Sequence, residues 1–348
     1  MSGRGRTARA LELALALGLG LALLALVFRG VSWPAFANAL AGVEPVWLVA
    51  SIALFVTTHA SRGWRWMVAV RPVRALPFRR AYSIQAVGLL AIQALPFRLG
   101  ELARPYLLWE REGVPLGGGM FAVVVDRSLD LVAVALLLTV AVAAADLPLH
   151  TIEVAGVEIA LVQQGRIGVA LALVPLLAVL AAVAIGGEGA IERMRGLATR
   201  VHPGLGRRLA AGLEPFHEGV RGLGSLRHAA PMAGVTLAAW ILNALAVWAL
   251  CRAMGFDDID PLGGLVLLLV MTLGLMLPSA PFSIGIVEAF LVAGLVLLGI
   301  GHDPALAYAV VFRAINVLVV GGLGITFLAV DRISFRAIAA FTRAERDR

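Results

Sequence analysis

Long hydrophobic runs recur along the chain and are separated by short polar segments that are rich in arginine. A helix needs about 20 consecutive apolar residues to cross the hydrocarbon of a bilayer. The runs predict membrane-spanning helices at about residues 10–28, 46–68, 120–145, 168–186, 229–252 and 305–330. The pattern therefore indicates an all-α polytopic membrane protein, with residues 1–348 forming a single integral membrane domain.

Two further apolar segments, at about 81–96 and 262–278, end in an unusual break. In each break a proline is followed by a glycine and then by a glutamate, and the two sequences are Leu95–Glu101 and Ala280–Glu288. Unpaired backbone is tolerated at membrane depth only where it lines a protein-enclosed or wet cavity. Paired interruptions in the two halves of a chain point to a transport site.

The distribution of arginine predicts the orientation of the chain. Arginine is concentrated in the N-terminus, 62–80, 187–228 and the tail after Asp331. It is scarce in 29–45, 146–167 and 252–260. Because arginine-rich loops stay cytoplasmic, we expect both termini inside and a multi-pass location in the cell inner (plasma) membrane.

This orientation constrains the two broken segments. Residues 81–108 must enter and return on the cytoplasmic side, and residues 262–300 must do so on the outer side. We therefore expect an inverted repeat of three spans plus one re-entrant hairpin each, with repeat one at about 10–145 and repeat two at about 168–330. In the alternative, the broken segments cross fully and give eight or more spans. Hydropathy does not decide between the two.

Residues 187–228 form a basic cytoplasmic linker in this layout. Its apolar residues recur at spacings of three and four, from Leu205 to Leu223, which predicts one apolar helix face. Such a helix would lie on the inner leaflet or pack on neighbouring helices.

Composition excludes several function classes. The chain is 60% hydrophobic and 15% charged, against about 45–50% and about 25% in soluble domains. Its formal net charge of +7 therefore concerns orientation and anionic lipid, and we expect no nucleic-acid partner. Cys251 is the single cysteine and the six histidines are scattered, so we expect no metal site and no cofactor.

Ionisable residues at membrane depth are candidate functional residues. The first cluster is Arg98, Glu101 and Arg104. If a half-helix begins near Gly100, then Glu101 and Arg104 lie one turn apart on one face. The helix N-terminus and two guanidinium groups would suit a lipid phosphate. The alternative is a Glu101–Arg104 ion pair that only closes the hairpin.

The second cluster is Asp126, Arg127 and Asp130. Asp126 and Asp130 are four residues apart and share a helix face, whereas Arg127 points about 100° away from Asp126. The two carboxylates would bind a proton or cation, or they would hold the arginines of the first hairpin. Both possibilities remain open.

The third cluster is Glu288, which follows the second break, with Arg313 and Asn316 on the last predicted span. Arg313 and Asn316 are three residues apart and share a face. We expect Glu288 and Arg313 to pair, because an unpaired charge there would be very unfavourable. Direct contact with substrate remains an equal possibility. Arg62, Trp64, Arg65 and Trp66 occur where a span leaves the bilayer, and we interpret them chiefly as interface anchors, with headgroup binding as the alternative.

The run Pro96–Arg104, followed by Asp126, Arg127 and Asp130, resembles the lysylphosphatidylglycerol synthase transmembrane-region family, which is also called flippase-like. The Pro281–Glu288 segment and the Arg313–Asn316 pair fit the same pattern. The resemblance covers nearly the whole chain and implies movement of aminoacylated phospholipid between leaflets. It also links stand-alone relatives to polyprenyl-linked lipids and glycolipids, so it leaves the substrate open. We expect the flippase part only, without the soluble synthase domain, so lipid aminoacylation by this chain is not expected.

The expected function is therefore a lipid flippase or translocase for a phospholipid or lipid-linked substrate. In this hypothesis Arg98, Arg104 and Arg313 hold an anionic or phosphate headgroup, while Glu101 and Glu288 gate or titrate. The alternative is a membrane subunit or enzyme of lipid-linked glycan or aminoacyl-lipid metabolism. A separate lipid-modifying enzyme is a possible partner, and a non-transporting scaffold is the third hypothesis.

Overall fold

The computed structural model describes residues 32–95, 100–144, 152–154, 157–159, 226–275 and 281–346. Within them the chain is overwhelmingly helical. The predicted spans 10–28 and 168–186, and nearly all of the linker 187–228, lie outside the described residues.

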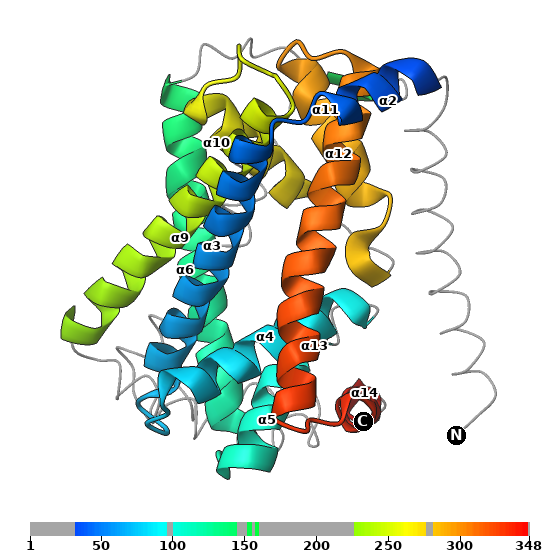
Figure 1. The fold of residues 1–348 in the computed structure, drawn as a ribbon. Coiled ribbons are helices and arrows are strands. Elements are labelled where there is room, and N and C mark those ends of the chain that lie inside the picture. Colours follow the sequence, from blue (N-terminus) through cyan, green and yellow to red (C-terminus); the bar gives the residue numbers. More distant parts are fainter. Residues whose placement is uncertain are drawn as a thin grey trace.

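Long helices run between the two ends of the molecule (Figure 1). They are α3 (Pro45–Val70), α6 (Leu116–Ala144), α9 (Leu226–Ala253) and one continuous rod made of α12 (His302–Asn316), η3 (Val317–Gly321) and α13 (Gly322–Val330). These helices match the predicted spans 46–68, 120–145, 229–252 and 305–330. By length and composition, Pro231–Ala253 and His302–Val330 are apolar enough to cross a membrane.

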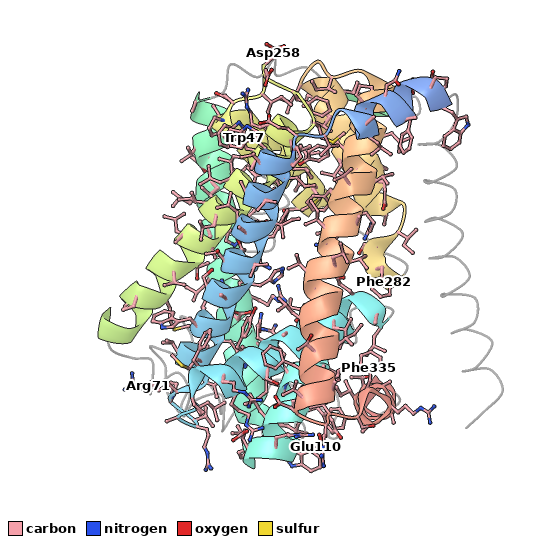
Figure 2. All side chains as sticks on the ribbon, viewed as in Figure 1. Trp47, Arg71, Glu110, Asp258, Phe282 and Phe335 are labelled. Atoms are coloured by element: carbon pink, nitrogen blue, oxygen red, sulfur yellow. The ribbon has the colours of Figure 1, made fainter. Side chains whose placement is uncertain are left out.

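Short helices mark the two ends of the bundle (Figure 1). At the α2 end, helix α2 (Trp33–Ala41) leads into α3, and the Glu44 N–H donates to the carbonyl of Ala253 (2.7 Å). At the opposite α14 end lies the last helix, α14 (Phe335–Arg346). Figure 2 shows Asp258 at the α2 end and Arg71 and Glu110 at the α14 end.

The first break joins α4 (Phe78–Ala94) to α5 (Ala103–Glu112). Arg79 near the start of α4 pairs with the Asp331 carboxylate (2.8 Å), and Arg111 near the end of α5 donates to the Asp331 carbonyl (2.8 Å). The α4–α5 hairpin therefore enters and leaves at the α14 end. A Cβ atom at Gly100 would lie 2.1 Å from the backbone nitrogen of Ile92, so only glycine allows the chain to return this closely along α4.

The second break joins α10 (Pro261–Gly274), through the short turn η2 (Pro281–Ser283), to α11 (Ile286–Leu297). Helix α10 begins with Asp260 accepting a hydrogen bond from the Gly263 N–H (2.7 Å), and Pro261 occupies the first turn. Both α10 and α11 lie in the α2 half of the molecule (Figure 1). The turn η2 contacts α4, so the two breaks meet inside the bundle.

Two features of the fold were not expected from the sequence. Strands β1 (Ile152–Val154) and β2 (Val157–Ile159) pair antiparallel within the 146–167 segment. The segment η3 is π-helical and follows Asn316 directly. It widens the helix in the middle of the last long rod.

Two hydrophobic clusters fill the bundle, one around each hairpin. The cluster in the α2 half includes Leu267 on α10 and Leu291 on α11, and the cluster in the α14 half includes Val87 on α4 and Leu107 on α5. The long helices contribute to both clusters, and on α3 and α6 buried charged residues lie between them. This arrangement places a polar layer across the middle of an otherwise apolar bundle.

Candidate functional site

The polar layer is built largely from positions that separate the two hydrophobic clusters on α3, α6 and α9. On α3, Phe55 belongs to one cluster and Trp66 to the other, with Arg62 and Arg65 between them. On α6, the acidic residues Asp126 and Asp130 lie in the same way between Val123 and Ala133, and on α9 Thr236 lies between Met232 and Trp240. The charges of α3 and α6 and the Thr236 hydroxyl of α9 therefore lie at one level.

Asp126 and Arg65 form the buried side of the charged cluster. The Asp126 carboxylate pairs with Nη2 of Arg65 (2.7 Å) and with Nη1 of Arg104 (2.9 Å). Arg65 is 1% exposed and Arg104 is 0% exposed. Buried charges of this kind are strongly destabilising unless they are paired, and here each guanidinium contacts two carboxylates.

Glu101 and Arg127 form the side of the cluster that faces the cavity. Glu101 pairs with Nη2 of Arg104 (3.1 Å) and with Nη2 of Arg127 (3.0 Å). Asp130 pairs with Nη1 of Arg65 (2.7 Å) and more loosely with Nη1 of Arg127 (3.5 Å). The contacts close a ring of alternating charges, here named the charge ring: Arg65, Asp126, Arg104, Glu101, Arg127 and Asp130. Each carboxylate in the ring is held by two guanidinium groups.

Neutral side chains complete the charge ring. Gln85 on α4 accepts from Nη1 of Arg104 (3.0 Å), and Nε1 of Trp240 donates to Asp130 (3.0 Å). The Arg104 guanidinium also lies over the Trp66 ring, 4.5 Å from its centroid. These contacts connect the ring to α3, α4, α5, α6 and α9 at once.

Arg313 holds the second break. Its Nε donates to the Glu288 carboxylate (2.7 Å), and its Nη groups donate to the carbonyls of Phe282 (2.6 Å) and Ser283 (3.2 Å). Phe282 and Ser283 have φ values of 61° and 51°, which are strained for residues with a side chain. Glu288 also accepts from the N–H of Gly285 (2.8 Å), at the start of α11. The predicted Glu288–Arg313 pair is therefore present.

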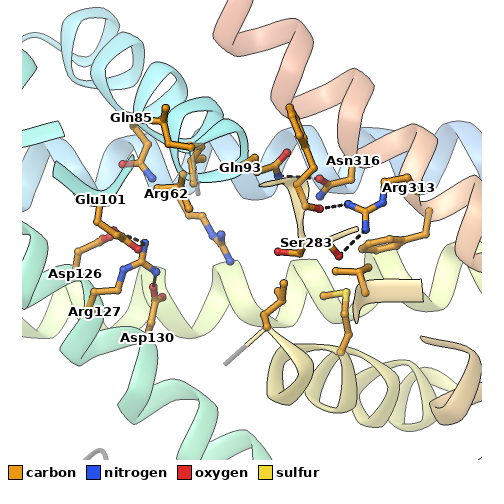
Figure 3. A pocket seen from close by; sticks show the side chains of 18 of the residues that line it. Arg62, Gln85, Gln93, Glu101, Asp126, Arg127, Asp130, Ser283, Arg313 and Asn316 are labelled. Carbon is orange, nitrogen blue, oxygen red and sulfur yellow. Dashed lines mark hydrogen bonds and ion pairs between the residues drawn. The ribbon is translucent and has the colours of Figure 1, made fainter. Parts of the chain in front are cut away.

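A cavity of about 230 Å³, here named the polar chamber, lies between the charge ring and the second break. Figure 3 shows charge-ring side chains on one side of it and Arg313, Ser283 and Asn316 on the other. Gln93 on α4 donates to the Asn316 side chain across it (2.8 Å). The chamber thus joins residues from both broken segments and from the long helices.

A second cavity of about 470 Å³, here named the apolar chamber, adjoins the first. Five polar residues line both chambers: Arg62, Gln93, Arg127, Asp130 and Asn316. The remaining lining of the second is mainly apolar and includes Leu131, Val134, Leu138 and Leu268. Thr58, His59, Asn243 and Thr272 are the further polar residues of this lining. The site is therefore amphipathic, with a polar compartment that opens into an apolar one.

The structure brings most of the predicted site residues together. Glu101, Asp126, Arg127, Asp130, Arg313 and Asn316 line the polar chamber. Glu288 lies directly behind Arg313. Arg104 is fully buried behind Glu101, so its hydrogen bonds position the ring and it is not presented to the chamber. Arg98 lies outside the described residues.

Arg62 and Arg65 correct the interpretation of 62–66 as interface anchors. Arg65 and Trp66 are buried inside the bundle, and Arg62 lines both chambers. The available signal was their spacing of three within an apolar run, the same signal that singled out Arg313 and Asn316. Gln85 and Gln93, seen here in the site, were not predicted either.

The chain is similar in sequence to a known glycosyltransferase and to one family of membrane proteins. It is 26% identical over 327 residues to glycosyltransferase AglD from Haloferax volcanii, which covers 86% of this chain. The chain spans about half of the length of that relative (52%). The family described as the lysylphosphatidylglycerol synthase TM region matches residues 11–324. Because this match covers most of the chain, the protein belongs to the lysylphosphatidylglycerol synthase transmembrane-region family of membrane proteins.

Proposed function

We propose that the protein is a lipid flippase that moves a phospholipid or lipid-linked substrate between the leaflets of the membrane. The observation that carries the proposal is the amphipathic cavity, in which a polar chamber at the two helix breaks opens into an apolar chamber. A lipid has the same division into a polar headgroup and an apolar chain. The family membership supports a role in lipid or glycan metabolism.

The headgroup would occupy the polar chamber, beside Glu101, Arg127 and Asn316. Glu101 and Arg127 are suited to respond to a ligand, because they are the more exposed members of the charge ring. Arg104 and Arg313 would act as positioning residues, since their donors are engaged by carboxylates and carbonyls. The two breaks would supply the irregular backbone that transport sites place at membrane depth.

In the membrane, the α4–α5 and α10–α11 pairs would form re-entrant hairpins that enter from opposite faces. With spans at 10–28 and 168–186, the halves 10–145 and 168–330 would form an inverted repeat. The α14 end would face the cytoplasm, with both termini and the linker 187–228 on that side. This layout is supported by the contacts of Asp331 with both ends of the first hairpin and by the arginine distribution.

A second candidate is a membrane subunit or enzyme that handles lipid-linked glycans. The observation that favours it is the similarity to glycosyltransferase AglD, with which this chain aligns over about half of that protein (52%). In this role the cavity would hold a lipid-linked substrate for a separate enzyme.

The test of transport is a scrambling assay with purified protein in liposomes, in which dithionite bleaches fluorescent phospholipid that reaches the outer leaflet. Glu101→Ala opens the charge ring at the chamber and should abolish movement. Glu110→Ala on the same hairpin changes an exposed glutamate and should retain it. Movement that Glu101→Ala leaves intact would remove the proposed site. If wild-type protein moves no anionic, zwitterionic or polyprenyl lipid, the flippase proposal is wrong. A lipid that is chemically altered after incubation with the purified protein would identify an enzyme.

A further inference from the structure

The formal charges of the described side chains around the two chambers do not sum to zero. The charge ring contains three arginines and three carboxylates, so it is neutral as a unit. Glu288 and Arg313 neutralise each other at the second break. Arg62 belongs to neither group, so the described residues around the two chambers carry one excess positive charge.

Arg62 lies where a ligand would cross from one chamber to the other. It precedes Arg65 by one turn of α3 and lines both cavities. Figure 3 shows its guanidinium pointing into the space between the charge ring and the second break. The position joins the polar compartment to the apolar one.

The Arg62 guanidinium has no carboxylate or carbonyl partner among the described residues. Its Nε is buried without a hydrogen bond, as are those of Arg65, Arg104 and Arg127, but the Nη groups of those three arginines pair with carboxylates. Its described contact is with the Trp240 ring, 5.8 Å from the guanidinium carbon, at the far limit of a cation–π interaction. Asp130 is the carboxylate with the strongest electrostatic attraction to Arg62. It already pairs with Arg65 and Arg127 and accepts a hydrogen bond from Trp240. Arg62 is half-buried, and a guanidinium in this state has unused donors that favour an anion.

We propose that Arg62 binds the phosphate of a lipid with net negative charge, whose hydrocarbon chain lies in the apolar chamber. The inference rests on the proposed function for the presence of a lipid, and it adds the residue and the charge class. Guanidinium binds phosphate oxygens with two parallel donors. Leu131, Val134 and Leu138 line the compartment that receives the chain. A cationic headgroup would be repelled by the excess charge.

The first test separates a ligand role from a structural one in lipid-depleted, detergent-purified protein. Arg62→Gln removes an unpaired charge and should melt at the same temperature as wild type or higher. Arg65→Gln opens the charge ring and should melt at a clearly lower temperature. If Arg62→Gln melts as low as Arg65→Gln, Arg62 is a structural cation and the inference is overturned.

The second test measures binding of dioctanoyl lipids by native mass spectrometry. Dioctanoyl phosphatidylglycerol should bind more tightly than dioctanoyl phosphatidylcholine, and the phosphotriester ethylphosphatidylcholine, which is cationic, should bind least. Arg62→Gln should weaken phosphatidylglycerol binding at least about tenfold, as expected for the loss of a charged hydrogen bond. Arg62→Lys should restore part of the affinity. Arg71→Gln, an exposed arginine at the end of the same helix, is the matched control and should bind like wild type.

Two probes identify the source of the anion. Dioctanoylglycerol has the chains without phosphate, and inorganic phosphate has the anion without chains. Binding of inorganic phosphate as tight as that of phosphatidylglycerol would overturn the lipid assignment, and unchanged phosphatidylglycerol binding by Arg62→Gln would overturn the role of Arg62. Scrambling by wild type that Arg62→Gln retains refutes this inference while the flippase proposal stands. Arg62-dependent lipid binding without scrambling supports the inference and refutes the flippase proposal.

Discussion

Arg313 contacts Glu288 through Nε alone, at 2.7 Å, so both of its Nη groups are left to hold the backbone of the second break. One side chain thereby joins the last long helix to α11 and to a turn with positive φ. The geometry depends on the planar fork of arginine as well as on its charge.

Arg313→Lys should keep the ion pair with Glu288 but release the carbonyls of Phe282 and Ser283. Both residues are half-buried, so losing the two hydrogen bonds would cost on the order of 1 kcal/mol each. We expect a lower melting temperature and faster hydrogen exchange in residues 281–286. Unchanged exchange in this turn would show that Arg313 serves as a charge only.

The charge ring predicts that its members depend on one another. Arg65→Gln should destabilise the protein by about 3–5 kcal/mol, because it leaves buried carboxylates under-compensated. Combining it with Asp130→Asn restores neutrality and should recover part of the loss. The check is a double-mutant cycle of melting temperatures, and strict additivity of the two changes would argue against a coupled ring.

Gly100 offers a steric test of the first hairpin. Gly100→Ala places a Cβ atom against the backbone of α4, so α5 must move, and we expect a loss of about 1–3 kcal/mol together with impaired lipid movement. Gly322→Ala is the matched control, since outside the backbone of its own helix no atom lies within 4 Å of its added Cβ. That change should be neutral or stabilising, because alanine is the better helix former. Equal effects of the two substitutions would contradict the close approach of α5 to α4.

Asp331 gives the α14 end a defined pH dependence. Burial alone would raise its pKa, but hydrogen bonds from Ser83 and Arg79 outweigh burial, and the pKa lies below its ordinary value. Its stabilising effect is therefore fully present above the pKa of an unfolded aspartate, about 3.9, and is lost as the pH falls through the lower folded value. Melting temperatures measured from pH 7 downward should fall at acid pH, and Asp331→Asn should flatten this part of the curve. Curves that remain parallel would show that Asp331 contributes nothing to the acid response.

The sequence predicted those parts of the site that depend on local geometry. The four-residue spacing of Asp126 and Asp130 placed both carboxylates on one face, and burial made pairing of Glu288 with Arg313 the expected outcome. It did not predict that Arg65 would bridge the two aspartates, because that contact depends on how α3 packs against α6. The same dependence explains why Trp66 was interpreted as an interface anchor although it lies inside the bundle.

The π-helical segment Val317–Gly321 has a consequence for the mechanics of the whole molecule. On its N-terminal side, α12 carries Arg313, which contacts the second hairpin at Glu288. On its C-terminal side, α13 leads to Asp331, which contacts the first hairpin at Arg111. A π segment interrupts the regular i to i−4 bonding that makes an α-helix stiff. The rod that connects the two hairpins is therefore not one regular α-helix. Its π-helical segment separates the part that holds the second hairpin from the part that holds the first, although one continuous stretch of chain links them.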